Sequence, residues 1–185
     1  RETYISLIKS NNELLLRLIN DVLDISKIES GMVFFAYTDV YLPSAMRDMY
    51  NIMQLRMPEN VELILDPCPD IMIRTDNNRM VQILSNLLTN AIKHTSCGSI
   101  RFGYTLKGDH VHFYVSDTGK GIPEKELDHI FGRFVQLKGA YNGIGLGLAI
   151  SKGLVNKMGG EISVSSKVGE GSTFRFTLPL ANILS

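Results

Sequence analysis

The chain has no tryptophan, only two cysteines and no excess of charge of either sign, because 19 basic residues balance 19 acidic ones. Balanced charge argues against a nucleic-acid-binding protein, which needs basic side chains to neutralise phosphates. Cys68 and Cys97 are too few for a disulfide framework and lack metal-ligand spacing. No polybasic tail, secretory signal or apolar run of membrane-spanning length occurs among the 185 residues. These absences favour a globular protein with two ordinary thiols in a reducing compartment.

Apolar residues account for 44% of the chain, which is enough to fill a sizeable core in one domain or in a domain with an appendage. The first residue is Arg1 rather than methionine. We therefore expect a piece of a longer protein, from which a sensory or targeting segment is missing.

Residues 2–30 have the apolar periodicity of one long helix, and Gly31 follows where a helix C-cap is expected. The apolar stripe is wider than the seam of a two-stranded coiled coil. Its members are Ile8, Leu15, Leu16, Leu18, Ile19, Val22, Leu23 and Ile25. A stripe this broad favours a helical bundle, and packing of the helix on its own domain is the alternative.

Beyond residue 31, strands and helices mix without strict alternation. Apolar runs and alternating patterns predict strands at residues 33–40, 61–65, 71–74, 99–106, 110–116, 161–166 and 172–178. Helical patterns predict helices at residues 43–57, 76–95, 124–134 and 144–158. We therefore expect an α+β fold, a two-layer α/β sandwich preceded by a long bundle-forming helix.

The expected helix at residues 76–95, capped by Asp76, carries a polar group beside its core stripe. At about 100° per residue, Asn86, Asn90 and Lys93 fall together on the flank of the apolar face, with Arg79 alongside. An asparagine carbonyl oxygen is a hard ligand of the kind that Mg²⁺ accepts, and lysine binds phosphates. The group predicts a site for a metal-bound triphosphate, with a solvated polar face as the alternative.

Two glycine clusters follow, at residues 117–123 (Asp-Thr-Gly-Lys-Gly-Ile-Pro) and 143–148 (Gly-Ile-Gly-Leu-Gly-Leu). Neither is a P-loop or a Rossmann fingerprint, because no G-x-x-x-x-G-K-[ST] or G-x-G-x-x-G run exists. A carboxylate at Asp117 is costly to bury without a hydrogen-bond donor, and the adenine amine is such a donor. Glycines that open a helix let phosphate oxygens approach its unpaired amides. The clusters therefore predict a nucleotide site.

In this order the segments resemble the ATP-binding domain of sensor histidine kinases, in the superfamily shared with gyrase B subunits and ninety-kilodalton heat-shock chaperones. The family's N box, first glycine box, F box, second glycine box and a third glycine element look like residues 86–93, 117–123, 130–134, 143–148 and 169–174. The resemblance implies a Bergerat-type ATP-binding catalytic domain at residues 32–185. It also implies that residues 1–31 are the C-terminal helix of the dimerisation and histidine-phosphotransfer domain, whose first helix is absent.

ATP and Mg²⁺ are the cofactors that the resemblance implies, with Asn90 as the metal ligand and Asp117 as the acceptor for the adenine amine. Asn86 would position water or polarise the reacting end, and Arg133 is a candidate γ-phosphate contact. The implied catalytic residues are Asn86, Asn90, Lys93 and Arg133. The implied nucleotide-binding residues are Asn86, Asn90, Lys93, Asp117, Gly119, Gly121, Ile122, Gly143, Gly145, Leu146, Gly147, Leu148 and Thr173. Residues 135–142 would form a short lid over ATP.

The implied activity is that of a protein histidine kinase of a two-component system, which transfers the ATP γ-phosphoryl group to a histidine and then to an aspartate of a response regulator. None of the four histidines, His94, His110, His112 and His129, lies in a phosphoacceptor motif. We therefore expect the acceptor on a helix upstream of Arg1, and no autophosphorylation of this fragment alone.

The resemblance also implies partners and a location. The partners are ATP, the upstream acceptor helix, a response regulator and a second copy bound through the N-terminal helix, with no nucleic acid. The catalytic portion of such a bacterial-type kinase is cytoplasmic, and the full-length protein can be anchored in the cell membrane by a segment outside this chain.

Two other functions stay open. One is ATP hydrolysis, although gyrase-like members place a glutamate base four residues before the metal-binding asparagine, where this chain has Asn86. The other is a degenerate module that dimerises and binds no nucleotide. The presence of Asn90, Asp117 and the boxed glycines argues against it.

Overall fold

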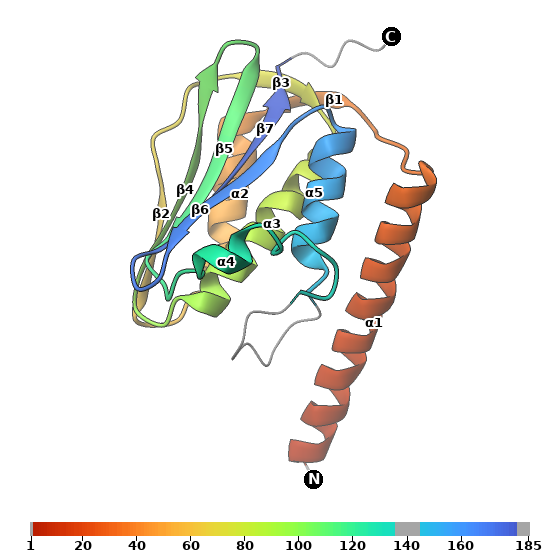
Figure 1. Ribbon diagram of the computed structural model, residues 1–185, viewed down its shortest axis with the longest axis vertical. Helices are drawn as coiled ribbons and strands as arrows, with labels where there is room; N and C mark the ends of the chain where they lie inside the picture. The colour runs from red at the N-terminus through yellow and green to blue at the C-terminus, as the bar shows by residue number, and fades with distance from the viewer. Residues whose placement is uncertain (1, 136–144, 181–185) are drawn as a thin grey trace.

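The computed structural model describes residues 2–135 and 145–180, which form a β-sheet covered on one face by helices, with one long helix beside them (Figure 1). The expected α+β two-layer sandwich with a long N-terminal helix is confirmed. Helix α1 (Glu2–Ser30) has the predicted bounds, and Gly31 follows it with a left-handed φ of 71°. That backbone conformation is typical of a glycine at a helix C-terminus.

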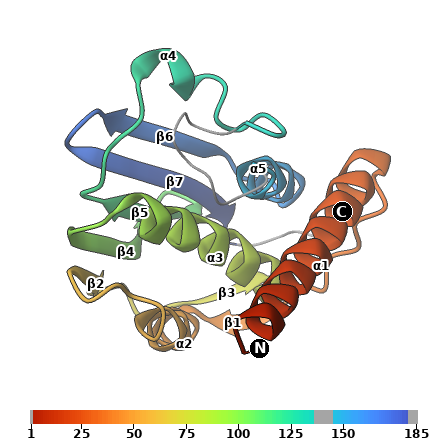
Figure 2. The same ribbon diagram turned by 90° about the horizontal axis from the view of Figure 1, so that it is seen from below.

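Five strands form the main sheet in the order β2-β4-β5-β7-β6. Their bounds are β2 (Val61–Leu65), β4 (Gly98–Lys107), β5 (His110–Asp117), β6 (Ile162–Lys167) and β7 (Gly171–Pro179). Only β2 and β4 are parallel, and the predicted hairpins β4–β5 and β6–β7 are confirmed. Alternate residues of β5 are buried, because one face of the sheet packs on helices and the other is left open (Figure 2).

Helices α2 (Leu42–Gln54), α3 (Asn77–His94) and α5 (Gly147–Lys157) lie on the inner face of the sheet (Figure 2). α3 is central and buries the apolar stripe predicted for it. The buried members are Met80, Ile83, Leu84, Leu87, Leu88 and Ala91. The Asp76 carboxylate accepts a hydrogen bond from the Arg79 N–H at 3.0 Å, which confirms the predicted cap.

The strand expected at residues 33–40 is wrong for residues 33–37. The strand that forms there, β1 (Thr38–Tyr41), pairs antiparallel with β3 (Met72–Thr75) in a separate two-stranded sheet. The Ala36 N–H donates to the Asp76 carboxylate at 2.8 Å. The carboxylate that caps α3 thus satisfies the Ala36 N–H, so this N–H does not need a partner strand.

The helix expected at residues 124–134 is wrong beyond its first turn. Helix α4 (Glu124–Leu127) ends early, and the N–H groups of His129 and Gly132 donate to carbonyls three residues back. These tight turns bury Ile130 and set Phe131 edge-on to Phe174, with ring centroids 6.2 Å apart. Ile130 and Phe131 therefore reach the core from a tightly turned segment, while Phe134 is exposed.

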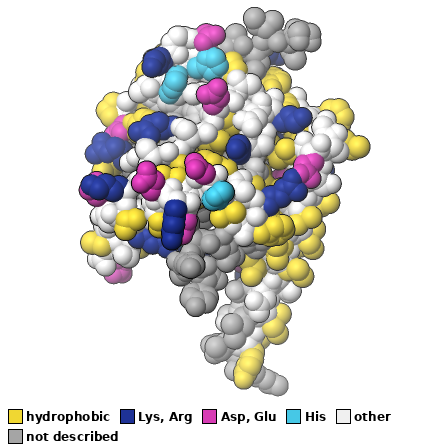
Figure 3. Space-filling view, viewed as in Figure 1, with side chains coloured by type: hydrophobic (Ala, Val, Ile, Leu, Met, Phe, Trp, Pro, Cys, Tyr) yellow, Lys and Arg dark blue, Asp and Glu magenta, His cyan; other side chains and the backbone are white. Residues whose placement is uncertain are grey.

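α1 contacts the helical layer through its C-terminal turns. Ile25 and Ile28 are partly buried there, and Asp24 accepts a hydrogen bond from Gln82 Nε2 at 2.8 Å and lies 3.6 Å from the Arg79 guanidinium. The N-terminal half projects beyond the other elements, and exposed apolar side chains lie along α1 from Tyr4 to Leu23 (Figures 1 and 3). Exposed apolar residues of α1 include Tyr4, Ile5, Ile8, Leu15, Leu16, Ile19, Val22 and Leu23. Packing on the same domain therefore accounts for only the last turns of α1.

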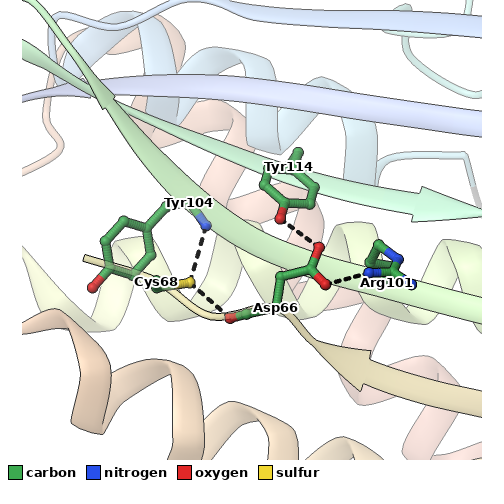
Figure 4. Close-up of polar contacts among 5 residues, drawn as sticks. All are labelled: Asp66, Cys68, Arg101, Tyr104 and Tyr114. Carbon is green, nitrogen blue, oxygen red and sulfur yellow. Dashed lines mark hydrogen bonds and ion pairs between the residues drawn. The ribbon is translucent and has the colours of Figure 1, made fainter. Parts of the chain in front are cut away.

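A polar network fastens the turn after β2 to the sheet (Figure 4). The Asp66 carboxylate accepts hydrogen bonds from Arg101 at 2.5 Å and from the Tyr114 hydroxyl at 2.6 Å. The Cys68 thiol donates to the Asp66 carbonyl at 3.1 Å and accepts from the Tyr104 N–H at 3.4 Å. Burial raises the pKa of the Cys68 thiol, so its role here is that of a structural hydrogen-bonding group.

Candidate functional site

A cavity opens between the C-terminal half of α3, the end of β5 and the start of α5. Together with its mouth it encloses about 680 Å³ of empty space. The predicted site residues that line it are Asn90, Lys93, Asp117, Gly121, Ile122, Gly145 and Leu148. Val135, the first residue of the predicted lid, and His94 also line the cavity. Sequence reasoning missed the other lining residues, which are Ala91, Ile130, Ser172 and Phe174. The fold thus brings the N box and both glycine boxes to one cavity.

Asp117 is the buried carboxylate of this cavity, with 6% of its surface exposed. Burial raises its pKa, while the N–H groups of Gly119 (2.8 Å from Oδ1) and Ser172 oppose that rise by hydrogen bonding. The buried Thr95 hydroxyl is near enough to this carboxylate to lower its pKa as well, although it makes no hydrogen bond of normal geometry. A carboxylate held in this way can accept a hydrogen bond from an amine in the cavity.

The two glycines of the first glycine box have different roles. A Cβ at Gly119 would lie 2.2 Å from the His94 carbonyl oxygen, so this glycine lets the loop pack against the end of α3. Gly119 does not line the cavity, whereas Gly121 does. Gly121 has a φ of +70°, and a Cβ there would lie 2.1 Å from the Lys167 carbonyl oxygen. Both positions therefore exclude side chains for reasons of backbone packing.

The polar flank predicted for α3 is divided between two environments. Asn90 and Lys93 line the cavity. Asn86 does not, because its amide nitrogen donates to the Gly147 carbonyl at 3.2 Å and to the Ser151 hydroxyl at 3.3 Å. Helical periodicity placed the three residues on one flank correctly, but it could not show that α5 covers the first of them.

His94 lines the cavity at the end of α3, and its position directly after Lys93 in the sequence indicates a residue that can touch phosphate. Burial and the nearby Lys120 and Lys93 lower its pKa from 6.5 to about 4. The imidazole is therefore neutral at neutral pH and can donate or accept a hydrogen bond in the cavity. Burial and Lys120 also lower the pKa of Lys93. Lys93 lines the cavity, and Lys120 is near enough to lower the pKa of both groups, so positive charge adjoins this end of the cavity and favours an anionic ligand.

The structure describes the second glycine box only from Gly145 onward. Gly143 lies outside the described residues, and so does the predicted lid apart from Val135. Gly145 lines the cavity with a φ of +73°, which is not helical, so α5 begins at Gly147 rather than at residue 144. Leu148 also lines the cavity, while Leu146 is buried in the core.

Arg133 and Thr173 are not brought to the cavity. The Arg133 guanidinium forms an ion pair with Glu29 at the end of α1. The Thr173 hydroxyl lies 2.8 Å from the Ser116 hydroxyl on the opposite face of the sheet. Since side chains alternate along a strand, Ser172 faces the cavity in place of Thr173. The alternating pattern of β7 was the signal that could have identified Ser172.

A buried carboxylate, an amide-bearing helix and a glycine-rich helix start around one cavity define a nucleotide-binding domain of the Bergerat type. The chain belongs to the family of histidine kinase-, DNA gyrase B- and HSP90-like ATPases, whose model matches residues 75–182. Over 95% of its length it is 41% identical to the circadian input-output histidine kinase CikA of Synechococcus elongatus. Over 96% of its length it is 38% identical to the aerobic respiration control sensor protein ArcB of Escherichia coli. The predicted resemblance to sensor histidine kinases is confirmed.

Solved structures agree with this assignment. Full-length ShkA in complex with AMPPNP superposes with a TM-score of 0.86 at 31% identity, covering 100% of this chain and 40% of that one. The nucleotide-free catalytic domain of histidine kinase ThkA gives a TM-score of 0.70 at 27% identity, covering 80% of this chain and 97% of that one. The chain spans 24% of the length of both CikA and ArcB. Within the described residues, no helix is both long and apolar enough to cross a membrane.

Proposed function

We propose that this chain is the ATP-binding catalytic part of a two-component sensor histidine kinase. The observation that carries the proposal is the buried Asp117 carboxylate, which shares one cavity with Asn90, Lys93 and the Gly145 backbone. An ATP site requires two parts. One is an acceptor for the adenine amine, and the other is a separate group of amides and cations for the phosphates. The similar protein ShkA was solved in complex with AMPPNP, an ATP analogue, which supports a nucleotide as the ligand.

Magnesium fits the phosphate end of this site. Asn90 lines the cavity and offers an amide oxygen, a hard ligand that Mg²⁺ accepts together with water and phosphate oxygens. When bound, the ion would supply positive charge that offsets the negative charge developing on the phosphates during phosphoryl transfer. Lys93 would contact the phosphates as a point charge. Arg133 is engaged with Glu29, so a γ-phosphate contact by this residue would require that ion pair to open.

The phosphoryl group would pass from ATP to a histidine on a helix that precedes this chain, and then to an aspartate of a response regulator. Catalysis of such a transfer consists mainly of positioning and charge stabilisation. The exposed apolar residues along α1, from Tyr4 to Leu23, support a homodimer in which this helix joins a bundle with the upstream acceptor helix. In such a kinase the catalytic portion works in the cytoplasm, while a segment outside this chain can anchor the protein in the membrane.

ATP hydrolysis remains the second candidate function, with water as the acceptor. A hydrolase would need a base at position 86, and the amide there is hydrogen-bonded to α5. A degenerate module without nucleotide binding is the third. The Asp117 carboxylate, buried in an open cavity, is costly to keep without a ligand that donates to it, which argues against this third function.

Calorimetric titration with AMPPNP, with and without magnesium, tests the proposal. We expect one site per chain, tighter binding with magnesium, and binding of ADP at the same site by competition. Absence of binding in a folded sample would contradict the proposal.

A further inference from the structure

Three carboxamides lie one helical turn apart along a flank of α3, and each meets a different element. Gln82 donates to Asp24 of α1, Asn86 donates to α5, and Asn90 lines the cavity. The middle residue stands where hydrolases of the superfamily carry their glutamate base. In this chain Asn86 contacts α5 and does not line the cavity in which a reacting phosphate would lie.

We propose that Asn86 is a positioning residue for nucleotide binding, which holds the start of α5 and the adjoining Gly145 backbone beside the phosphates without touching them. This inference rests on the proposed function, since it names how the phosphate end of the same site is held in place. It replaces the role predicted from the family resemblance, in which Asn86 positions water or polarises the reacting end.

The direction of the hydrogen bonds carries the first step. Asn86 Nδ2 lies 3.2 Å from the Gly147 carbonyl oxygen and 3.3 Å from Ser151 Oγ. A carbonyl oxygen can only accept, so the nitrogen end of the amide must face α5. Ser151 has 0% of its surface exposed, so it is shielded from bulk solvent. The amide therefore connects α3 to the first turn of α5 through a part-buried hydrogen bond to Gly147 and a second one to a fully buried hydroxyl.

The position of that first turn carries the second step. Gly147 begins α5, and Gly145, two residues earlier, lines the cavity in a left-handed conformation. A Cβ at Gly145 would lie 2.5 Å from the Val135 carbonyl oxygen, so the backbones of these two lining residues are in close contact. A shift at the start of α5 would therefore alter both. Asn86 acts on the phosphate end of the site through this backbone.

The substitution Asn86→Asp separates the two roles. It keeps the size and shape of the side chain but replaces the donor with an oxygen, which repels the Gly147 carbonyl. If Asn86 faced the reacting phosphate, the carboxylate would instead supply a base and raise ATP hydrolysis. We expect the affinity for AMPPNP with magnesium to fall about tenfold, because the part-buried Gly147 carbonyl and the buried Ser151 hydroxyl lose the donor that connects them to α3. We also expect unchanged affinity for adenosine and no gain in hydrolysis.

Two further variants control for general destabilisation. Gln82→Ala removes the carboxamide one turn earlier, which contacts Asp24 and not α5, and should leave AMPPNP affinity unchanged. Ser151→Ala removes only the longer of the two hydrogen bonds and should weaken AMPPNP binding about twofold, with adenosine unaffected. Thermal melting of each variant checks that it folds. If Asn86→Asp does not fold, Asn86→Ala replaces it in the comparison of AMPPNP and adenosine affinities.

Wild-type affinity for AMPPNP in Asn86→Asp, or a gain of hydrolysis, would overturn the positioning role. So would an equal loss of adenosine and AMPPNP affinity, since a purely structural defect would lower both. If the wild-type chain bound neither ligand, the proposed function itself would fall, and this inference with it.

Discussion

Ile28 of α1 occupies the space that a side chain at Gly153 of α5 would need, because a Cβ at Gly153 would lie 2.7 Å from Ile28 Cγ2. The glycine is therefore where the long helix rests on the catalytic domain. The ion pair between Glu29 and Arg133 adjoins it. One contact region thus combines a close apolar approach with opposite charges.

Gly153→Ala should loosen α1 while leaving the rest of the domain folded. The added methyl group improves helix propensity in α5 but overpacks Ile28, at a cost of about 1–3 kcal/mol. Hydrogen exchange of the last two turns of α1 should rise about tenfold, since about 1.4 kcal/mol corresponds to one decade. Adding Ile28→Ala to this variant makes room for the new methyl group and should lower the exchange rate of α1 again. Equal exchange rates in the single and double variants would contradict a steric contact between positions 28 and 153.

Asp117→Asn should lower the affinity for nucleotides while leaving the stability of the fold almost unchanged. The single amide oxygen would accept from the Gly119 N–H, as Asp117 Oδ1 does, which leaves the amide nitrogen, a donor, facing the adenine amine. Binding of ATP and of ADP should therefore weaken alike by about 1–3 kcal/mol. Because burial disfavours the charged carboxylate of Asp117, its neutral replacement should leave the free energy of unfolding within about 1 kcal/mol of the wild-type value. Calorimetry and urea unfolding measure the two quantities. Unchanged nucleotide affinity would remove Asp117 from the base site.

Asn90→Ala should lower the part of ATP affinity that depends on magnesium and leave adenosine binding almost unchanged. Asn90 lines the cavity on α3, whereas Asp117, the proposed acceptor for the base, is at the end of β5. Titrations of ATP with magnesium and with EDTA give the magnesium-dependent part. Equal losses for ATP and adenosine would place Asn90 at the base instead.

His94 should make the fold less stable in mild acid. Its pKa is about 4 in the folded chain and about 6.5 as a free side chain, so the unfolded state takes up the proton first. The neutral imidazole contributes its full stability above pH 6.5, and this contribution is lost as the pH falls from 6.5 towards 4. The raised pKa of Asp117 acts in the opposite direction near the lower end of this range.

His94→Gln isolates that effect, because Asp117 is common to both proteins. Free energies of unfolding should therefore converge or cross between pH 7 and pH 5 when the wild-type chain and the variant are compared. Parallel pH profiles would show that His94 does not titrate in this way.

The chain should remain unlabelled when it is incubated with radiolabelled ATP and magnesium, because none of its histidines lies in a phosphoacceptor motif. A separate polypeptide that carries the upstream acceptor helix should become labelled if the two pieces reassemble through α1. Acid-labile label on this chain alone would contradict the proposal, and mass spectrometry would then locate it, with His94 as the first residue to inspect.

Some of this protein could be predicted from local sequence because the relevant interactions are local. The periodicity of residues 2–30, the capping carboxylate of Asp76 and the turn around Gly108 each act within a few residues. For this reason α1 and the β4–β5 hairpin have the predicted positions to within about one residue. The family resemblance added Asp117 and Asn90, which the fold then brings to one cavity.

Other features depend on contacts between residues far apart in the chain, so the tertiary structure decided them. Ala36 bonds to Asp76 instead of joining a strand, and Ile130 reaches the core from tight turns rather than from a helix. Asn86 has the same helical phase as Asn90, yet α5 covers only the first of them. Sequence periodicity determines which side of an element a residue occupies. What lies opposite that side depends on the packing of the whole chain, which buries apolar surface wherever backbone groups can also be satisfied.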